Sequence, residues 1–277
     1  MDPIEERVQE LLARMTLEEK ASLTAGSGPW HGVAIPRLGI PRLKVTDGPT
    51  GARGEAAGGA LTAACFPNGS ALAATFDPDL VERVGEALAQ EARSKGAHVL
   101  LGPTVNMHRS PLGGRHFECY SEDPHLAARI AVAFVRGVQR LGVGTSVKHF
   151  VANDSEFERH TISSELDART LREIYLPPFE GAVREAGAWT VMAAYNRIGG
   201  TYACEHEALL RGVLKEEWGF DGVVVSDWGA VHTTAETARG GCDLEMPGPA
   251  RHLGPALAKA VEAGEVPEAV VDDMARR

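Results

Sequence analysis

Ionisable side chains follow several short apolar runs of this sequence. Asp47 comes after one run, Lys148 and His149 close a second, and Tyr195 and Asp227 follow two more. If these runs are parallel strands of one barrel, their carboxyl ends meet at one face, where active sites are built. We therefore expect these five side chains to share a pocket.

The chemistry of that pocket suits a sugar. It would hold two carboxylates, an imidazole, aromatic rings and the cations of Lys148 and Arg115. Carboxylates and cations hydrogen-bond hydroxyl groups, and aromatic rings stack on apolar C–H faces. A carboxylate beside the anomeric carbon can stabilise or trap an oxocarbenium-like transition state. The sequence has no obvious metal cluster and no glycine-rich phosphate loop, so we expect neither a metal nor a cofactor.

Composition narrows the partners. The 277 residues are 44% hydrophobic and 24% charged, with a formal net charge of −10, which disfavours nucleic acid and anionic membranes as main partners. No run approaches the roughly 20 apolar residues that span a bilayer. The first 20 residues lack the apolar core of a signal peptide, and the four cysteines are far apart without a CxxC pair. These features predict a cytoplasmic protein.

The elements that position the pocket alternate between strand and helix. Expected strands cover residues 42–45, 98–101, 145–149, 190–194, 223–226 and 242–246, and expected helices cover 124–141, 168–183, 205–218 and 257–263, with further helix starts at Thr16 and Asp77. This alternation implies right-handed βαβ units and a parallel sheet. The first main strand ends in Asp-Gly-Pro-Thr-Gly, without the phosphate turn of an open doubly wound sheet. We predict one α/β domain over residues 1–277, a (β/α)8 barrel of the TIM type, with an irregular or incomplete barrel as the variant.

A series of motifs sharpens this hypothesis. They lie at residues 12–20, 46–49, 114–118, 121–124, 147–150, 153–156, 194–196 and 225–229, and they read LARMTLEEK, TDGP, GRHFE, SEDP, VKHF, NDSE, AYN and VSDWG. In this order and spacing they resemble the N-terminal domain of glycoside hydrolase family 3, in its β-glucosidase branch. The resemblance runs from residue 12 to near residue 277.

The resemblance implies a retaining β-glycosidase, most simply a β-glucosidase. Asp227 matches the catalytic nucleophile, Trp228 matches a ring that lines the pocket, and Met192 is a candidate for its wall. Asp47, Arg115, Lys148, His149 and Tyr195 match positions that hold the sugar in the −1 subsite. The sequence departs from the family at His116 and Cys119, and Cys119 could alter the packing that aims Arg115.

Other roles remain open for several of these residues. Asp227 could be a helix N-cap, Lys148 and His149 a buried structural pair, and Tyr195 a packing residue. Structural roles are expected for Glu118, Glu122, Asp123, Asp243 and Glu245, and for the ion-paired or capping group Glu156, Glu158 and Arg159. Trp30 could border the aglycone site.

The proposed reaction also needs an acid/base. In the β-glucosidase branch this is usually a Glu on a following α/β-sandwich domain, which we expect to be absent from this chain and supplied by the parent protein or a separate chain. The branch of β-N-acetylhexosaminidases carries an internal His after Lys-His-Phe in a Pro-Gly-His-Gly stretch, but here residues 151–154 read VAND. His160 and Glu158 are remaining internal candidates, and a sugar-binding barrel without hydrolysis is the alternative. The sugar, the aglycone and the oligomeric state are open.

Overall fold

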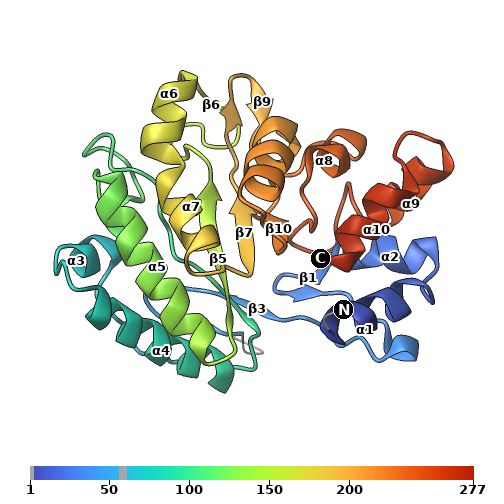
Figure 1. Ribbon diagram of the computed structural model, residues 1–277, viewed down its shortest axis with the longest axis horizontal. Helices are drawn as coiled ribbons and strands as arrows, with labels where there is room; N and C mark the ends of the chain where they lie inside the picture. The colour runs from blue at the N-terminus through green and yellow to red at the C-terminus, as the bar shows by residue number, and fades with distance from the viewer. Residues whose placement is uncertain (1–2, 56–60) are drawn as a thin grey trace.

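A parallel sheet forms the centre of the molecule. The computed structural model describes residues 3–55 and 61–277 (Figure 1). Its main sheet has the order β10-β7-β5-β4-β3, and every neighbouring pair is parallel. The strands are β3 (Val45–Asp47), β4 (Val99–Leu101), β5 (Gly144–Phe150), β7 (Thr190–Ala193) and β10 (Val223–Ser226). Helical crossovers connect them, as parallel neighbours require.

The sheet closes into a barrel through shorter contacts. A hairpin of β1 (Gly26–Gly28) and β2 (His31–Gly32) fills the gap between the two edges of the sheet. Isolated bridges pair Val225 with Leu244, Glu245 with Ala25, and His31 with Lys44. The backbone N–H groups of Ser226, Gly26 and Val45 donate across these joints to Leu244, Glu245 and Trp30, each at 2.9 Å. The predicted α/β barrel is confirmed, and its irregularity is this closing edge, where the bridge between His31 and Lys44 is antiparallel.

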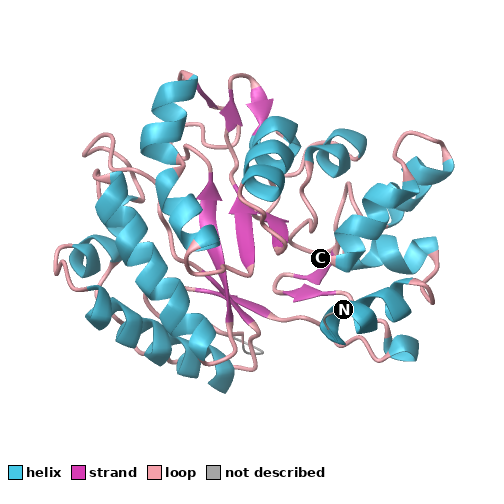
Figure 2. Ribbon diagram, viewed as in Figure 1, coloured by secondary structure: helices cyan, strands magenta, loops and turns pink. Residues whose placement is uncertain are grey.

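Helices cover the outside of the barrel (Figure 2). They are α1 (Pro3–Leu12), α2 (Leu17–Leu23), α3 (Gly69–Ala73), α4 (Pro78–Ser94), α5 (Pro124–Arg140), α6 (Ala168–Thr170), α7 (Pro177–Arg184), α8 (Ala235–Gly240), α9 (Pro255–Glu262) and α10 (Glu268–Arg276). Helices α4, α5 and α7 pack in sequence against one side, whereas α1, α2, α9 and α10 group together beside the closing edge. Among the helices of the described residues, none is long and apolar enough to cross a membrane.

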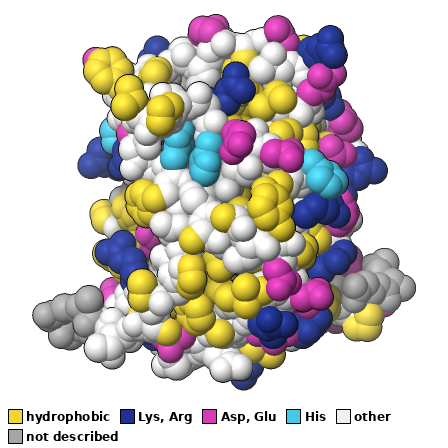
Figure 3. All heavy atoms as spheres, turned by 90° about the vertical axis from the view of Figure 1, so that its left-hand side faces the viewer, with side chains coloured by type: hydrophobic (Ala, Val, Ile, Leu, Met, Phe, Trp, Pro, Cys, Tyr) yellow, Lys and Arg dark blue, Asp and Glu magenta, His cyan; other side chains and the backbone are white. Residues whose placement is uncertain are grey.

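The remaining elements are short. Three 3-10 turns cover Pro36–Leu38, His116–Glu118 and Ala203–Glu205, and π-helical segments cover Leu171–Tyr175 and Ala208–Glu217. A small sheet of β6 (Ser163–Ser164), β8 (Arg197–Ile198) and β9 (Thr201–Tyr202) lies above the main strands. On the face covered by α3, α4 and α5, basic and acidic side chains are interspersed with apolar ones (Figure 3).

Local sequence signals place the helix starts. Asp77 accepts a hydrogen bond from Leu80 N at 2.9 Å, and Asp123 accepts one from His125 N at 2.8 Å; a proline follows each cap. Thr16 forms the predicted capping box with Glu19. These caps satisfy amides that would otherwise lack partners at a helix start. The structural role expected for Asp123 is thereby confirmed.

Three expected elements differ in the structure. The helix expected over 168–183 is divided at Leu176, before Pro177 and Pro178, because proline has no N–H to continue the helix. The helix expected over 205–218 begins at residue 208 and is π-helical. The strand expected over 242–246 forms only bridges. There Asp243 N and Leu244 N both donate to Val224 O, at 2.8 and 3.1 Å, which prevents a regular ladder.

A buried ion pair braces this irregular segment. Lys215 Nζ lies 2.6 Å from Asp243 Oδ1, and Asp243 Oδ2 accepts from Val224 N at 2.8 Å. The two side chains are only 4% and 1% exposed. Burial raises the pKa of Asp243 and lowers the pKa of Lys215, and the attraction between the two charges opposes both shifts. The pair therefore holds the segment at residue 243 against β10, in the structural role expected for Asp243.

Removing one partner should leave the other as an uncompensated buried charge. We predict that Lys215→Met lowers the free energy of unfolding by about 3–5 kcal/mol, measured by urea denaturation followed by circular dichroism. Arg169→Ala is the control, because the pair of Arg169 with Glu173 is 84% and 58% exposed and should change stability little. Equal effects of the two substitutions would contradict the bracing role.

Candidate active site

One cavity at the carboxyl ends of the central strands collects the predicted site residues. Its volume is about 190 Å³. Its lining includes all eight of them: Asp47, Arg115, Lys148, His149, Met192, Tyr195, Asp227 and Trp228. Asp47 ends β3, Lys148 and His149 lie in β5, Tyr195 follows β7, and Asp227 follows β10. The expected convergence of strand ends therefore occurs.

Asp227 is a nearly buried carboxylate with one uncommitted oxygen. It is 7% exposed, and its Oδ1 accepts a hydrogen bond from Trp228 N at 2.7 Å. Its Oδ2 has no hydrogen-bond partner among the described residues. Burial raises the pKa of Asp227, against the Trp228 amide, the charge of Lys148 and the nearby Tyr195 hydroxyl, which lower it; that hydroxyl makes no hydrogen bond to Oδ2 and donates to Trp228 O. Nearby cations therefore act on Asp227, but burial outweighs them.

Asp47 is the opposite kind of carboxylate. Its Oδ1 pairs with Lys148 Nζ at 2.8 Å, and its Oδ2 lies 3.5 Å from Arg53 Nη1. Burial raises the pKa of Asp47, but the charge and the hydrogen bond of Lys148 outweigh that effect, and the net pKa is lowered. Asp47 therefore stays ionised with both oxygens engaged.

His149 is held as a neutral imidazole with a defined tautomer. Burial lowers its pKa well below the ordinary value, and the charges of Arg115 and Lys148 act in the same direction. The oxygen of the Asn106 side chain accepts from His149 N at 2.9 Å and lies 3.1 Å from His149 Nδ1. Nδ1 therefore carries the proton, and Nε2 presents a lone pair 3.5 Å from Asp227 Oδ2. These two acceptors lie side by side, so a donor such as a sugar hydroxyl can approach either of them from the cavity.

An irregularity in β5 lets two successive residues face the cavity. Neighbouring side chains of a regular strand point to opposite faces, yet Lys148 and His149 both line the cavity. The register of β5 with β7 shifts between Val147 and Phe150. The Lys148–His149 and Phe150–Val151 peptide bonds are cis.

Arg115 and Arg159 reach the cavity from loops above the strands. A hydrogen-bond network fixes the loop that carries Arg115. Arg115 Nε donates to Glu118 Oε1, and Thr104 Oγ1 donates to Glu118 Oε2 at 2.8 Å, so Glu118 has the loop-fixing role expected for it. Cys119 Sγ contacts Arg115 O at 3.6 Å, and burial raises the pKa of the thiol to about 12. The cysteine is thus a packing neighbour of the arginine, as its position in the motif suggested.

Arg159 also lines the cavity, although only an ion-paired or capping role was expected for it. Its predicted ion pair with Glu156 exists at 3.0 Å, but its guanidinium also lies 4.8 Å from the centre of the Tyr195 ring and lines the cavity. The available signal was its place in the loop that follows β5, because loops at this end of a barrel build the site.

Aromatic rings form the mouth. Trp228 Nε1 donates to Pro29 O at 2.9 Å, and the Trp228 and Trp30 ring centres are 5.4 Å apart. Tyr195 donates its hydroxyl proton to Trp228 O at 3.1 Å. Met192, 2% exposed, contributes to the buried wall. The placement of Trp30 agrees with the expected border of an aglycone site.

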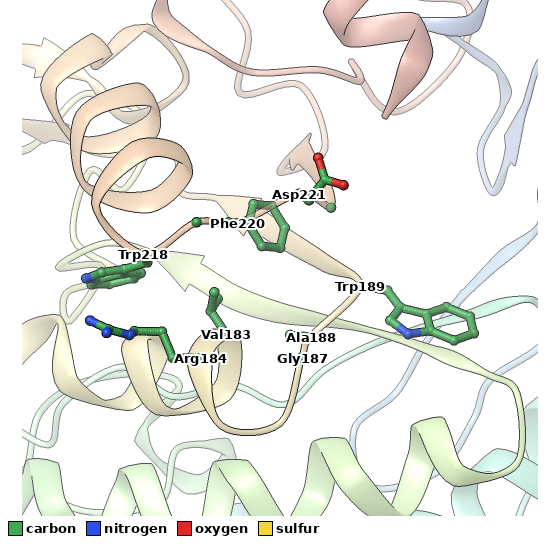
Figure 4. A pocket seen from close by; sticks show the side chains of 10 residues that line it. Val183, Arg184, Gly187, Ala188, Trp189, Trp218, Phe220 and Asp221 are labelled. Carbon is green, nitrogen blue, oxygen red and sulfur yellow. The ribbon is translucent and has the colours of Figure 1, made fainter. Parts of the chain in front are cut away.

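A larger hollow lies elsewhere. A cavity of about 530 Å³ at the amino ends of β7 and β10 is lined by Trp189, Trp218, Arg184 and Asp221, among others (Figure 4). None of the predicted site residues belongs to it.

Glu245 has the structural role expected for it. Its carboxylate accepts hydrogen bonds from three successive amides at residues 251–253. Across the residues that the structure describes, no group of three or more His, Cys, Asp or Glu side chains could hold a metal.

Comparison with known proteins agrees with this geometry. The family model described as Glycosyl hydrolase family 3 N terminal domain matches residues 31–277. A beta-glucosidase of Rhizobium radiobacter is 58% identical over 98% of this chain and 33% of its own length, and beta-glucosidase B of Emericella nidulans is 49% identical over 100% and 32%. The chain therefore spans about a third of the length of these curated relatives.

Solved structures give the same picture. The chain is similar to the beta-glucosidase from Kluyveromyces marxianus in complex with glucose, with a TM-score of 0.95 and 44% identity over 97% of this chain and 33% of that one. It is also similar to beta-glucosidase 3B from Thermotoga neapolitana in complex with glucose, with a TM-score of 0.93 and 40% identity over 98% and 41%.

The half-buried carboxyl group of Asp154 supports the loops of the site. Asp154 Oδ1 accepts from Met107 N at 3.1 Å, and Asp154 O lies 3.2 Å from His116 Nε2. Burial raises the pKa of Asp154 to about 6, against hydrogen bonds from Met107 and Tyr175 that lower it. Folding therefore favours the protonated carboxyl.

The raised pKa makes a signed prediction. Between the unfolded pKa of 3.8 and the folded value of about 6, the folded chain holds a proton that the unfolded chain releases. Stability from this group is present below the lower pKa and is lost as the pH rises through the higher one. Relative to Asp154→Asn, we predict that the parent chain loses about 1–3 kcal/mol of unfolding free energy between pH 4 and pH 7. Urea denaturation of both chains across this range measures it, and a difference independent of pH would contradict it.

Proposed function

Because the chain belongs to glycosyl hydrolase family 3, we propose that it is the nucleophile-bearing and sugar-binding part of a retaining β-glucosidase. The observation that carries the proposal is the uncommitted Oδ2 of Asp227 inside a cavity lined by groups that bind hydroxyls. Relatives named beta-glucosidase, similar over 98–100% of this chain, support the substrate class.

The proposed reaction is a double displacement. Asp227 Oδ2 attacks the anomeric carbon, the bond from that carbon to the aglycone oxygen breaks, and a general acid protonates the departing oxygen. The same group, now a base, takes a proton from water. The water oxygen then bonds to the anomeric carbon and displaces Asp227, so the sugar leaves with its original configuration.

The side chains around Asp227 would hold the sugar. The Asp47 carboxylate accepts hydrogen bonds from hydroxyls, and the Lys148 ammonium donates to hydroxyl oxygens. His149 Nε2 accepts a hydrogen bond from a sugar hydroxyl close to Asp227 Oδ2. Hydrogen bonds fixed in place before the reaction stabilise the charge that develops in the transition state. Trp30 and Trp228 would contact the aglycone at the mouth.

We propose that the acid/base comes from outside these 277 residues. Among the described residues, the carboxylates lining the cavity are Asp47 and Asp227, and Lys148 keeps Asp47 ionised. The internal candidates Glu158 and His160 do not line it, although the His160 ring packs against Tyr195. Glu118 and Glu156 are paired with Arg115 and Arg159. The chain spans about a third of the length of its relatives, so their remaining length is enough for a second domain. Such a domain would belong to the same protein or to a separate chain.

Exposed apolar side chains mark where that domain would sit. Leu112 and Phe117 flank Arg115 and are 90% and 58% exposed, and Phe157, two residues before Arg159, is 73% exposed. Apolar side chains grouped on a rim of polar groups are typical of contact surfaces. A domain that covers this rim would both bury them and bring its acid to the cavity mouth.

The nucleophile can be tested without that domain. Incubation with 2,4-dinitrophenyl 2-deoxy-2-fluoro-β-glucoside should form a stable adduct, because this leaving group needs little acid assistance. Intact-mass measurement and peptide mapping should place the sugar on Asp227, and Asp227→Asn should remain unlabelled. An adduct on another residue, or none on a chain that circular dichroism shows to be folded, would overturn the proposal. Glucose binding without any adduct would favour the alternative of a sugar-binding barrel.

The exposed rim makes a separate prediction. The 277-residue chain should self-associate at high concentration, because its apolar rim lacks a cover. The double substitution Leu112→Lys and Phe157→Lys should reduce the mass measured by light scattering. Leu43→Lys is the matched control, since Leu43 is exposed before β3, at the other end of the barrel. A sharp monomer at high concentration in the unmodified chain would contradict the docking rim.

A further inference from the structure

A second, smaller cavity lies behind the sugar site. Arg115 and His149 line both cavities, and Asn153, Asp154 and Glu156 line the smaller one. The loops that enclose it approach closely, since a Cβ at Gly114 would lie 3.2 Å from Glu156 Cγ. Its volume is about 10 Å³, which is close to the smallest space that holds one water molecule.

The side-chain amide of Asn153 lines this cavity without a hydrogen-bond partner among the described residues. The side chain is 7% exposed, and neither its Oδ1 nor its Nδ2 has a hydrogen-bond partner among the described residues. Buried amides in folded proteins are nearly always paired with protein or with ordered water. An amide that lacks both partners destabilises the fold by its full desolvation penalty. The cavity therefore contains both a donor and an acceptor in need of a partner.

Neighbouring side chains offer the remaining contacts. Arg115 uses Nε for Glu118, and within residues 3–55 and 61–277 its terminal nitrogens make no hydrogen bond to protein. Glu156 uses Oε2 for Arg159, which leaves its Oε1 as an acceptor. A bound water needs two to four polar partners. Asn153, Arg115 and Glu156 meet this requirement with both donors and acceptors.

We propose that the cavity binds one ordered water molecule, which joins the Asn153 amide to Arg115 and positions that guanidinium beside Asp227. Asn153 is then a positioning residue, because it acts through Arg115 and does not touch the substrate. The water site stands on the geometry alone. Its effect on the reaction rests on the proposed function.

A high-resolution crystal structure of the unmodified chain tests the site directly. The expected result is a single water within hydrogen-bond distance of the Asn153 amide and of Arg115 or Glu156. A collapsed cavity, with Asn153 bonded directly to protein, would overturn the proposal. This experiment needs no activity, so its outcome is independent of whether Asp227 is a nucleophile.

Asn153→Leu separates a water-bonded amide from an unsatisfied one. If the water is present, leucine removes its partner and should lower the Tm by about 2–4 °C. If Asn153 is simply unsatisfied, an apolar side chain of similar volume should raise the Tm, which would contradict the proposal. Ser146→Ala is the reference variant, because Ser146 Oγ is buried without a partner outside this cavity. Its Tm should stay the same or rise.

The positioning role has its own readout in the fluoroglucoside labelling of Asp227. Asn153→Leu should slow the labelling step at saturating probe by on the order of tenfold, because a displaced charge misaligns the reacting groups. Ser146→Ala should label at the parental rate. An unchanged labelling rate in folded Asn153→Leu would overturn the positioning role. Failure of the unmodified chain to label would count against the proposed function and leave the crystallographic and Tm tests of the water site intact.

Discussion

Two carboxylates line one cavity, and the Lys148 ammonium acts on both of them. Lys148 neutralises Asp47 directly at 2.8 Å, and its charge also lowers the pKa of Asp227, although burial of Asp227 has the larger effect. Burial keeps His149 neutral, and the charges of Arg115 and Lys148 act in the same direction, so that its Nε2 is an acceptor. The protonation states in the cavity thus depend on burial together with charges from other strands and loops, and the barrel must bring these groups together.

The barrel brings these groups together at the carboxyl ends of its central strands, although β5 and the closing edge of the sheet are irregular. The central strands need only three to seven residues each to deliver a side chain at their carboxyl ends. The shifted register of β5 allows Lys148 and His149 to face the same cavity, where a regular strand would send one of them into the packing outside. At the closing edge, where the backbone forms only isolated bridges, the Lys215–Asp243 ion pair holds the segment at residue 243 against β10. Precise placement in the site therefore depends on local departures from ideal geometry.

Sequence patterns predicted the parts of the structure that are local. The helix caps at Thr16, Asp77 and Asp123 and the apolar runs of the main strands can be recognised from neighbouring residues alone. The family resemblance named eight site residues, and all eight line one cavity. The β1–β2 hairpin was not predicted, because strands of three and two residues show no periodicity. The tautomer of His149, the free Oδ2 of Asp227 and the cavity beside Asn153 depend on distances between remote segments, and no residue spacing encodes them.

The pKa shifts seem at first to reverse the roles of the two carboxylates, since a raised pKa is usual for a catalytic acid and a lowered one for a nucleophile. Hydrogen bonding decides otherwise. Asp47 has committed both oxygens to Lys148 and Arg53, so attack would require breaking an ion pair. Asp227 has a free Oδ2, and its raised pKa means that its charge is less stabilised than in water. Forming a bond to an electron-poor carbon would relieve that deficit, so burial is compatible with the nucleophile role proposed for Asp227 and with the proposed acid/base outside the cavity.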